Sequence, residues 1–313
     1  MNLQQLEYVV AVDAHRHFAK AADACFVTQP TLSMQIKKLE EEIGVIIFDR
    51  SKKPVMTTRQ GRILIDQARI ALREINRIGE IMQSLKDEID GVFRIGIIPT
   101  LSPYLLPLFL PAFTRAYPKV ELVIEEQLSE VILRKISQDQ IDVGIMVAPK
   151  DMKGFRKQPL FFEEFLLYFS AQHPLTQQDE VALDELDLSE LWLLKEGHCF
   201  RDQIQQLCSR YEHEDAHPAI RFESGSLETV KRMVEHNFGF TLLPQLAIRD
   251  IRPENIPLLR HFKNRRPLRE VSLITARSFL KMKQIEALSD IILKCLPEEI
   301  VREETGEVIE WAG

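Results

Sequence analysis

Two of the four cysteines in this chain, Cys199 and Cys208, stand nine positions apart in one polar segment. His198 and Arg201 flank the first of them, and cationic neighbours lower the pKa of a thiol and so favour the reactive thiolate. Free cysteines are also among the most often buried residues, and in a reducing compartment most are inert packing groups. From this segment alone, a reactive thiol and a structural thiol are therefore equally good interpretations of Cys199.

The residues between the two cysteines predict a helix, because Phe200, Ile204 and Leu207 recur at spacings of four and three. Nine residues of helix separate two Cα atoms by about 13 Å, whereas a disulfide requires about 4.4–6.8 Å. A bond between these thiols would therefore require the helix to unwind, and a bond that needs a change of shape is a switch. The other two cysteines, Cys25 and Cys295, lie in apolar patterns and are predicted to be packing groups.

The composition is that of a chain with about two domains: 313 residues, 45% of them hydrophobic, with a net charge of -7. No apolar run approaches the length of a transmembrane helix, and the N-terminus lacks the basic and apolar blocks of a signal peptide. We therefore expect a cytoplasmic protein with no membrane contact. Four scattered cysteines without a CxxC pair argue against a zinc site, and we expect neither a metal nor another cofactor.

The first 58 residues predict three short helices and a turn-rich arm. Thr28 is placed as an N-cap with Pro30 in the first turn of the third helix, and Leu32 and Ile36 face inward on it. Two small helices joined by a short turn, the second bearing short polar side chains, form a helix-turn-helix whose second helix enters the major groove. A plain three-helix bundle with a polar outer face is the alternative.

Positive charge is concentrated in this part of the chain. Residues 1–89 carry a net charge of +1 and the remainder carries -8, and five basic residues fall between positions 50 and 62. Residues 50–58 read as a β-hairpin wing that brings this charge to the DNA backbone, although such a run is often only a solvated face. The predicted DNA-contacting residues are Thr28, Gln29, Pro30, Thr31, Ser33, Gln35, Lys37, Arg50, Lys52, Lys53 and Thr58.

From residue 61 to residue 89, small and apolar side chains recur at alternating steps of three and four. This heptad seam is typical of a two-stranded coiled coil, whereas a helix packed on its own domain more often shows a wider stripe. Dimerisation would supply the two-fold symmetry that a palindromic DNA site requires. The predicted dimer contacts are Ala68, Ala71, Ile75, Ile78, Met82 and Leu85.

Residues 92–300 alternate strands and helices, which predicts βαβ units and a parallel sheet in two α/β lobes. Thr100, Ser129 and the turn at 197–199 follow strands or begin helices, where amide donors and the helix dipole favour a thiolate or a polar oxidant. Strands are expected at 93–98, 120–124, 143–147, 164–170, 191–194, 240–243 and 271–275.

The N-terminal motif resembles that of the LysR-type transcriptional regulators. It comprises residues 21–22, 28–33, 35–36, 39–40, 44–48, 50 and 58–61. The resemblance implies an α/β protein that binds double-stranded promoter DNA and RNA polymerase as a homodimer or a dimer of dimers, and that is not an enzyme. The implied domains are a winged helix-turn-helix (1–58), a coiled-coil linker helix (59–90), a two-lobed periplasmic-binding-protein-like regulatory domain (91–300; lobe I 91–163 and 268–300, lobe II 164–267) and a tail (301–313).

Within the family, some segments resemble those of the members that sense hydrogen peroxide: residues 98–100 with 103–107, 197–199 with 201–203 and Cys208, and 226–229 with 241–244. The resemblance implies that Cys199 is the peroxidatic cysteine and Cys208 its resolving partner, in an activator of oxidative-stress genes that a cellular thiol reductant resets. The implied pocket consists of Thr100, Ser129 and His198, which seat the peroxide, with Arg269 as a support. Ser129 departs from the threonine expected there but keeps the hydroxyl, and the tail from about Leu296 matches no known pattern.

Two other functions fit the same residues. The chain could be a LysR-type regulator of a small-molecule inducer, with incidental cysteines, or a thiol peroxidase that carries a helix-turn-helix. The individual residues also have ordinary structural readings. Thr100, Ser129 and Glu228 could simply cap or begin helices, and Arg269 could face solvent.

Overall fold

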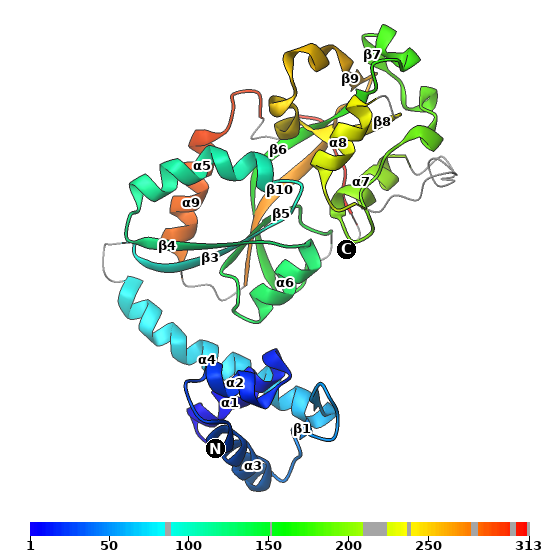
Figure 1. Cartoon of the computed structure of the whole chain (residues 1–313). Helices are drawn as coiled ribbons and strands as arrows, with labels where there is room; N and C mark the ends of the chain where they lie inside the picture. Colours follow the sequence, from blue (N-terminus) through cyan, green and yellow to red (C-terminus); the bar gives the residue numbers. More distant parts are fainter. Residues whose placement is uncertain are drawn as a thin grey trace. The chain divides into compact units, whose positions relative to one another are not determined.

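The computed structural model describes residues 1–84, 89–150, 152–208, 224–236, 239–276, 281–300 and 305–311 (Figure 1). The chain forms two compact units, Met1–Asp87 and Glu88–Gly313. No helix within the described ranges is long and apolar enough to cross a lipid bilayer.

The N-terminal unit is a winged helix-turn-helix followed by a long helix, as predicted. Asn2 caps the first helix in a capping box with Gln5, Thr28 caps the third, and Gly44 ends that helix in the left-handed conformation. Gly61 is required because a Cβ there would lie 2.2 Å from the carbonyl oxygen of Ile47. The elements are α1 (Leu3–His15), α2 (Phe18–Ala24), α3 (Gln29–Ile43), β1 (Phe48–Asp49), β2 (Met56–Thr57) and α4 (Arg59–Ser84).

Helix α4 corrects part of the predicted dimer seam. Ala68 is only 3% exposed because it packs into the core of its own unit, so the prediction that it faces a partner is wrong; Ala71 is partly buried against the same core. A spacing of three and four residues indicates that one stripe of the helix is buried. It does not indicate whether that stripe packs against the same chain or against a partner chain. Further along, Ile75 and Ile78 are 39% and 64% exposed. Leu85 and the side chain of Met82 lie outside the described part of the chain.

The C-terminal unit is built on one large mixed sheet with helices on its faces. Its strands are β3 (Gly91–Ile97), β4 (Val120–Glu126), β5 (Val143–Met146), β6 (Phe155–Phe169), β7 (Glu180–Val181), β8 (Phe240–Pro244), β9 (Leu259–Phe262), β10 (Pro267–Ala276) and β11 (Glu307–Val308). Its α-helices are α5 (Ser102–Ala116), α6 (Ser129–Ser137), α7 (Cys199–Leu207), α8 (Leu227–Glu235) and α9 (Met282–Cys295). Short 3-10 helices occupy Pro174–Gln177, Leu183–Glu185, Leu188–Glu190, Gln245–Asp250 and Pro253–Leu258.

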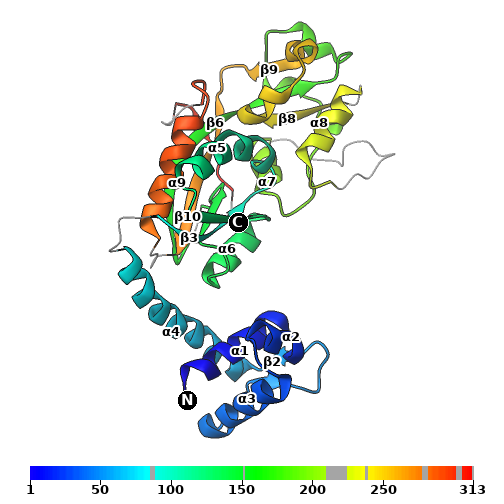
Figure 2. The ribbon, with the colours of Figure 1, turned by 60° about the vertical axis from the view of Figure 1, so that its left-hand side comes forward.

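The long strands β6 and β10 join the two lobes. They pair antiparallel from Leu268 opposite Glu164 to Ala276 opposite Phe155, and β10 also pairs antiparallel with β5. In the described part of lobe I, β3 pairs parallel with β4 and with β5, as strand–helix alternation predicts. Helices α5 and α9 lie side by side on this lobe, and α6 packs against β5 and β10 (Figure 2).

Two predicted strands differ from the structure, and the tail, for which no element was predicted, also has structure. The strand expected at 164–170 begins at Phe155, because its first half is charged and half exposed and does not read as an apolar strand. The strand expected at 191–194 is a single bridge between Leu191 and Phe240. The tail forms the short strand β11 followed by the buried residues Ile309 and Trp311.

Candidate functional sites

The outer face of α3 presents polar side chains to solvent. The Thr28 hydroxyl accepts a hydrogen bond from the Thr31 amide at 3.4 Å and lies 2.8 Å from the Thr31 hydroxyl. Gln35 differs from the prediction of a freely presented amide, because its Oε1 accepts a hydrogen bond from buried Gln5 at 3.2 Å. The predicted residues that are exposed on α3 and its cap are Thr28, Gln29, Pro30, Thr31 and Lys37.

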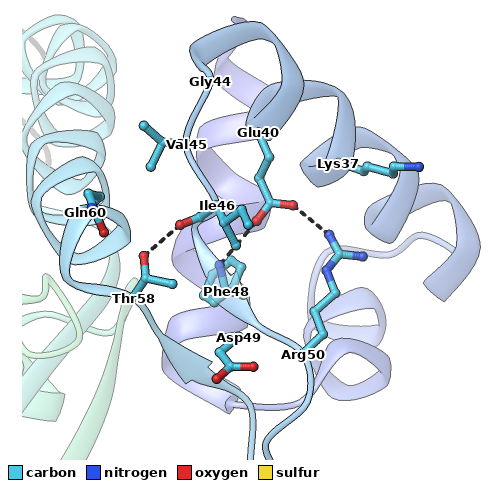
Figure 3. A pocket seen from close by; sticks show the side chains of 10 residues that line it. All are labelled: Lys37, Glu40, Gly44, Val45, Ile46, Phe48, Asp49, Arg50, Thr58 and Gln60. Carbon is cyan, nitrogen blue, oxygen red and sulfur yellow. Dashed lines mark hydrogen bonds and ion pairs between the residues drawn. The ribbon is translucent and has the colours of Figure 1, made fainter.

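The wing is tied to α3 by Arg50. Its guanidinium donates to Glu40 at 3.0 Å (Figure 3). It also donates to Ser33 at 3.0 Å and lies 5.0 Å from the Phe18 ring. Glu40, Arg50 and Thr58 line one pocket of about 940 Å³. In this pocket the Thr58 hydroxyl donates to the Ile46 carbonyl oxygen at 2.7 Å. Arg50 and Thr58 therefore orient the recognition elements. The two lysines of the β1–β2 turn, at positions 52 and 53, remain exposed.

We expect the paired substitution Lys52→Ala and Lys53→Ala to weaken binding to operator and to unrelated DNA alike. Each lysine–phosphate contact that is lost reduces the steepness of the plot of log affinity against log salt concentration by about 0.9. A salt titration of binding should therefore show a slope reduced by about 1.8 in the double variant. Lys153→Ala, an exposed lysine of the other unit, is the matched control and should leave both affinity and slope unchanged. A loss confined to operator DNA would contradict a backbone role.

The thiol site is centred on the first turn of α7. Gly197 adopts a φ of 87° just before the helix, His198 is its N-cap residue, and Cys199 is its first residue. Cys199 and Cys208 are both buried free thiols at opposite ends of the helix, with Cys208 at its C-cap. The helix predicted between them is confirmed, so the thiols stand in the separated arrangement in which a disulfide cannot form.

A fully buried arginine lies beside the thiol. Arg269 on β10 donates from Nε to Glu163 at 2.8 Å, and from its two Nη atoms to the Thr100 hydroxyl at 3.0 Å and the Thr100 carbonyl at 3.2 Å. Its guanidinium lies 5.6 Å from the ring of Phe200, which follows Cys199 in α7. The structure thus places Arg269 inside the site and binds Thr100 to it.

Burial raises the pKa of the Cys199 thiol, and the charge of Arg269 and the Ser129 hydroxyl oppose this effect. The expectation that His198 and Arg201 supply the stabilising cations is wrong. Burial, together with the charge of Lys195, lowers the pKa of His198 and keeps its ring neutral. Arg201 instead donates to the Leu194 carbonyl oxygen at 2.9 Å.

Two buried polar atoms on the elements that border the thiol lack a hydrogen-bond partner among the described residues: the Ser129 Oγ at the start of α6 and the His198 Nε2 at the N-cap of α7. Ser129 begins α6 and approaches Cys199 closely enough to favour its thiolate. A pocket of about 360 Å³ reaches His198 from the space between the lobes. It is lined by Pro99, Pro103, Glu126, Gln127, Leu128, Lys195, His198, Gly225, Ser226, Leu227 and Glu228.

Glu228 does more than begin α8. It accepts hydrogen bonds from the Tyr104 hydroxyl at 2.6 Å and from Lys231 at 2.7 Å, so it joins α5 of one lobe to α8 of the other. Burial and the Glu228 carboxylate raise the pKa of Tyr104, which therefore stays a neutral donor.

Glu163 is the site residue that sequence reasoning missed. It is fully buried, pairs with Arg269 at 2.7 Å and accepts the amide of Leu246 at 2.9 Å. The available signal was a pair of acidic residues inside the apolar run 160–169, since a charge there requires a buried partner.

The helix-turn-helix fold with an exposed polar face on α3 defines a DNA-binding regulator, and the α/β unit carries a pocket between its lobes. The lysR-family bacterial regulatory helix-turn-helix profile matches residues 3–62, and the LysR substrate binding domain profile matches residues 86–296. The chain belongs to the LysR family of transcriptional regulators.

Similar proteins point to one group within this family. The DNA-binding transcriptional dual regulator OxyR of Escherichia coli K12 is 38% identical over 249 residues, covering 79% of this chain and 80% of that protein. The hydrogen peroxide-inducible genes activator of Pectobacterium carotovorum is 37% identical, covering 93% and 96%. Full-length Pseudomonas aeruginosa OxyR with a cysteine-to-aspartate substitution superposes with a TM-score of 0.81 at 34% identity, covering 97% and 99%. A Corynebacterium glutamicum OxyR mutant with bound H2O2 has a TM-score of 0.61 at 29% identity, covering 94% and 92%.

Proposed function

We propose that this regulator senses hydrogen peroxide by reversible formation of a Cys199–Cys208 disulfide and thereby controls oxidative-stress genes. The observation that carries the proposal is a buried thiol at a helix start with a buried arginine beside it, together with polar atoms of Ser129 and His198 that are buried and lack a partner among the described residues. Such a site is shaped for a small, uncharged, polar molecule that accepts and donates hydrogen bonds. The names of the relatives, which include hydrogen peroxide-inducible genes activators, support the same choice of oxidant.

The chemistry proceeds in two balanced steps. The Cys199 sulfur attacks one peroxide oxygen; an S–O bond forms, the O–O bond breaks, and the departing hydroxide takes up the thiol proton to leave as water. Thr100, Ser129 and His198 seat the peroxide and assist this proton transfer, while Arg269 stabilises the negative charge on sulfur. The Cys208 sulfur then attacks the sulfenic sulfur, and a second water leaves as the disulfide forms. Exchange with a cellular thiol reductant restores both thiols.

The assembly we propose is a homodimer, joined further as a dimer of dimers, on double-stranded promoter DNA in the cytoplasm. The exposed apolar residues Ile75 and Ile78 of α4 support a partner along that stretch of the helix. Remodelling of α7 would shift the packing between subunits, turn the DNA-binding arms and change contact with RNA polymerase.

Promoter output after a peroxide pulse tests the proposal. We expect Cys199→Ser and Cys208→Ser to abolish induction, because the first removes the attacking sulfur and the second removes the resolving thiol. Cys25→Ser, at a half-buried thiol of the other unit, should leave induction intact. Normal induction in both of the first two variants would overturn the proposal.

A second candidate is a LysR-type regulator that responds to a small-molecule inducer, and the pocket of about 360 Å³ favours it. It predicts that induction survives loss of both cysteines and is lost when the pocket is filled. Peroxide consumption with a thiol reductant present separates either regulator from a peroxidase, since only an enzyme would turn over many times per chain.

A further inference from the structure

The end of the chain forms an ordered strap, residues 305–311, along the edge of β10. Its strand β11 pairs parallel with Pro267 and Leu268, through hydrogen bonds from the Glu307 amide to Arg266 (2.9 Å) and from the Ile309 amide to Leu268 (2.8 Å). Glu307 also forms a bidentate ion pair with Arg265, whose Nε donates to Oε2 at 3.0 Å and whose Nη2 donates to Oε1 at 2.7 Å. The strap is therefore held by both backbone and side chains at its start.

The far end of the strap is anchored to lobe I. Trp311 is buried, its indole Nε1 donates to the Val147 carbonyl at 3.2 Å, and its carbonyl accepts the Lys150 amide at 3.1 Å. Ile309, two residues earlier, is buried in the same core.

Between its two anchors the strap contacts the middle of α7. The Gln203 side chain is fully buried, and its Nε2 donates to the Ile309 carbonyl at 2.6 Å. Gln203 lies between the two cysteines, in the segment that must unwind before they can bond. At the other end of the helix, burial raises the pKa of the Cys208 thiol, and the charge of Arg265, the partner of Glu307, opposes this effect.

We propose that the strap holds α7 folded and thereby sets the rate at which Cys208 reaches oxidised Cys199. The inference rests on the proposed peroxide chemistry and concerns its second step. For α7 to unwind, Gln203 must give up its hydrogen bond to Ile309. Breaking this bond costs free energy because it leaves a buried amide group without a partner, so the bond opposes unwinding. The Gln203 Oε1 already lacks a hydrogen-bond partner among the described residues, so this bond is the one that fixes the side chain.

The first step should not depend on the strap. The side chains that influence the pKa of the Cys199 thiol are Arg269, Ser129 and Asp202, and among the described residues none of them hydrogen-bonds to residues 305–311. The strap thus offers positioning residues for disulfide closure, separate from the residues that activate the peroxidatic thiol.

The test uses the full-length chain with Trp311→Ala, which frees the far anchor of the strap. Stopped-flow measurement of sulfenic acid formation in a Cys208→Ser background gives the first step, and disulfide formation with both cysteines gives the second. We expect an unchanged first step and a second step accelerated about tenfold, which corresponds to about 1.4 kcal/mol. Trp311→Phe, which keeps the packing, should restore most of the wild-type rate.

Phe113→Ala is the matched control, because it removes a buried aromatic ring of lobe I that packs against Tyr117, away from the strap. It should leave the second step at the wild-type rate. If Trp311→Ala does not fold, Glu307→Gln is the variant that tests the proposal. It weakens the ion pair to Arg265 and should accelerate disulfide formation to a smaller extent.

The outcomes separate the two proposals. A wild-type chain that forms no disulfide with peroxide overturns the proposed function itself. A wild-type chain that forms the disulfide at the same rate as Trp311→Ala and Glu307→Gln overturns only the role of the strap. Acceleration of both steps together would also overturn it, because the strap would then act by loosening the whole site.

Discussion

Replacing Arg269 with methionine should slow the oxidation of Cys199 by peroxide about 10- to 1,000-fold, the range expected when a thiolate loses a neighbouring opposite charge. Arg269 is the largest influence that favours the thiolate against the burial that raises its pKa. Its loss leaves the hydroxyl of Ser129 as the remaining side-chain support for the charged sulfur. The rate is measured by stopped flow in a Cys208→Ser background, so that only the first step is observed.

The same substitution should destabilise the regulatory unit by about 3–5 kcal/mol, because removing one partner of a buried ion pair leaves the other charge uncompensated. The charge left without a partner is that of Glu163, which is fully buried. Adding Glu163→Gln removes that charge and should recover most of the stability in urea unfolding. It should not recover the oxidation rate, since the cation is still missing.

Lys157→Met is the control on the same pair of strands. It breaks a half-exposed ion pair with Glu270 and should change stability by about 0–1 kcal/mol, with no effect on oxidation. If the Arg269→Met, Glu163→Gln double variant oxidised as fast as wild type, the arginine would matter only for folding, and its electrostatic role in the site would be refuted.

The parts of this chain that sequence predicts well are those set by local pattern. Thr28 and Pro30 mark the start of the recognition helix, and the spacing of Phe200, Ile204 and Leu207 marks α7, because capping and amphipathic periodicity act within one helix. These signals need no knowledge of distant contacts.

The charge at the thiol could not be predicted this way. His198 and Arg201 are neighbours in sequence, but the cation that acts on Cys199 is Arg269, which the pairing of β10 with β6 brings into the core. Sequence proximity suggested the wrong groups, because the burial that positions a side chain also decides whether it is charged. His198 is neutral for that reason.

The sheet and the linker helix show the same limit. Strand–helix alternation is a local pattern, and it predicts the parallel strands β3, β4 and β5 correctly. The antiparallel direction of β10 arises because the chain returns from lobe II to lobe I, and no local sequence pattern indicates this return. Likewise, Ala68 fits a seam whichever surface covers it. The strap was missed because a two-residue strand has almost no periodicity, and its partners Gln203 and Leu268 are remote in sequence.

Oxidation by peroxide should make the backbone amides of α7 exchange with solvent deuterium about 100-fold faster or more, because an unwound segment loses the protection of its intrahelical hydrogen bonds. The physical reason is distance. The helix separates the two Cα atoms by about 13 Å, and a disulfide brings them to about 4.4–6.8 Å. No rotation of side chains alone closes that gap, so the backbone between Cys199 and Cys208 must change.

Helix α8 provides an internal control, since it also spans nine residues, lies in the same lobe and contains no cysteine. Its exchange should stay within about threefold of the reduced protein, as expected if the unwinding is a local event. The Cys208→Ser variant treated with the same peroxide should keep α7 protected, because sulfenic acid forms but no bond pulls the helix apart. A protein that loses two hydrogens by mass, which marks the disulfide, while α7 stays protected would show that the thiols join by another movement. The unwinding of α7 would then carry no signal, and neither the strap nor the subunit packing could respond to it.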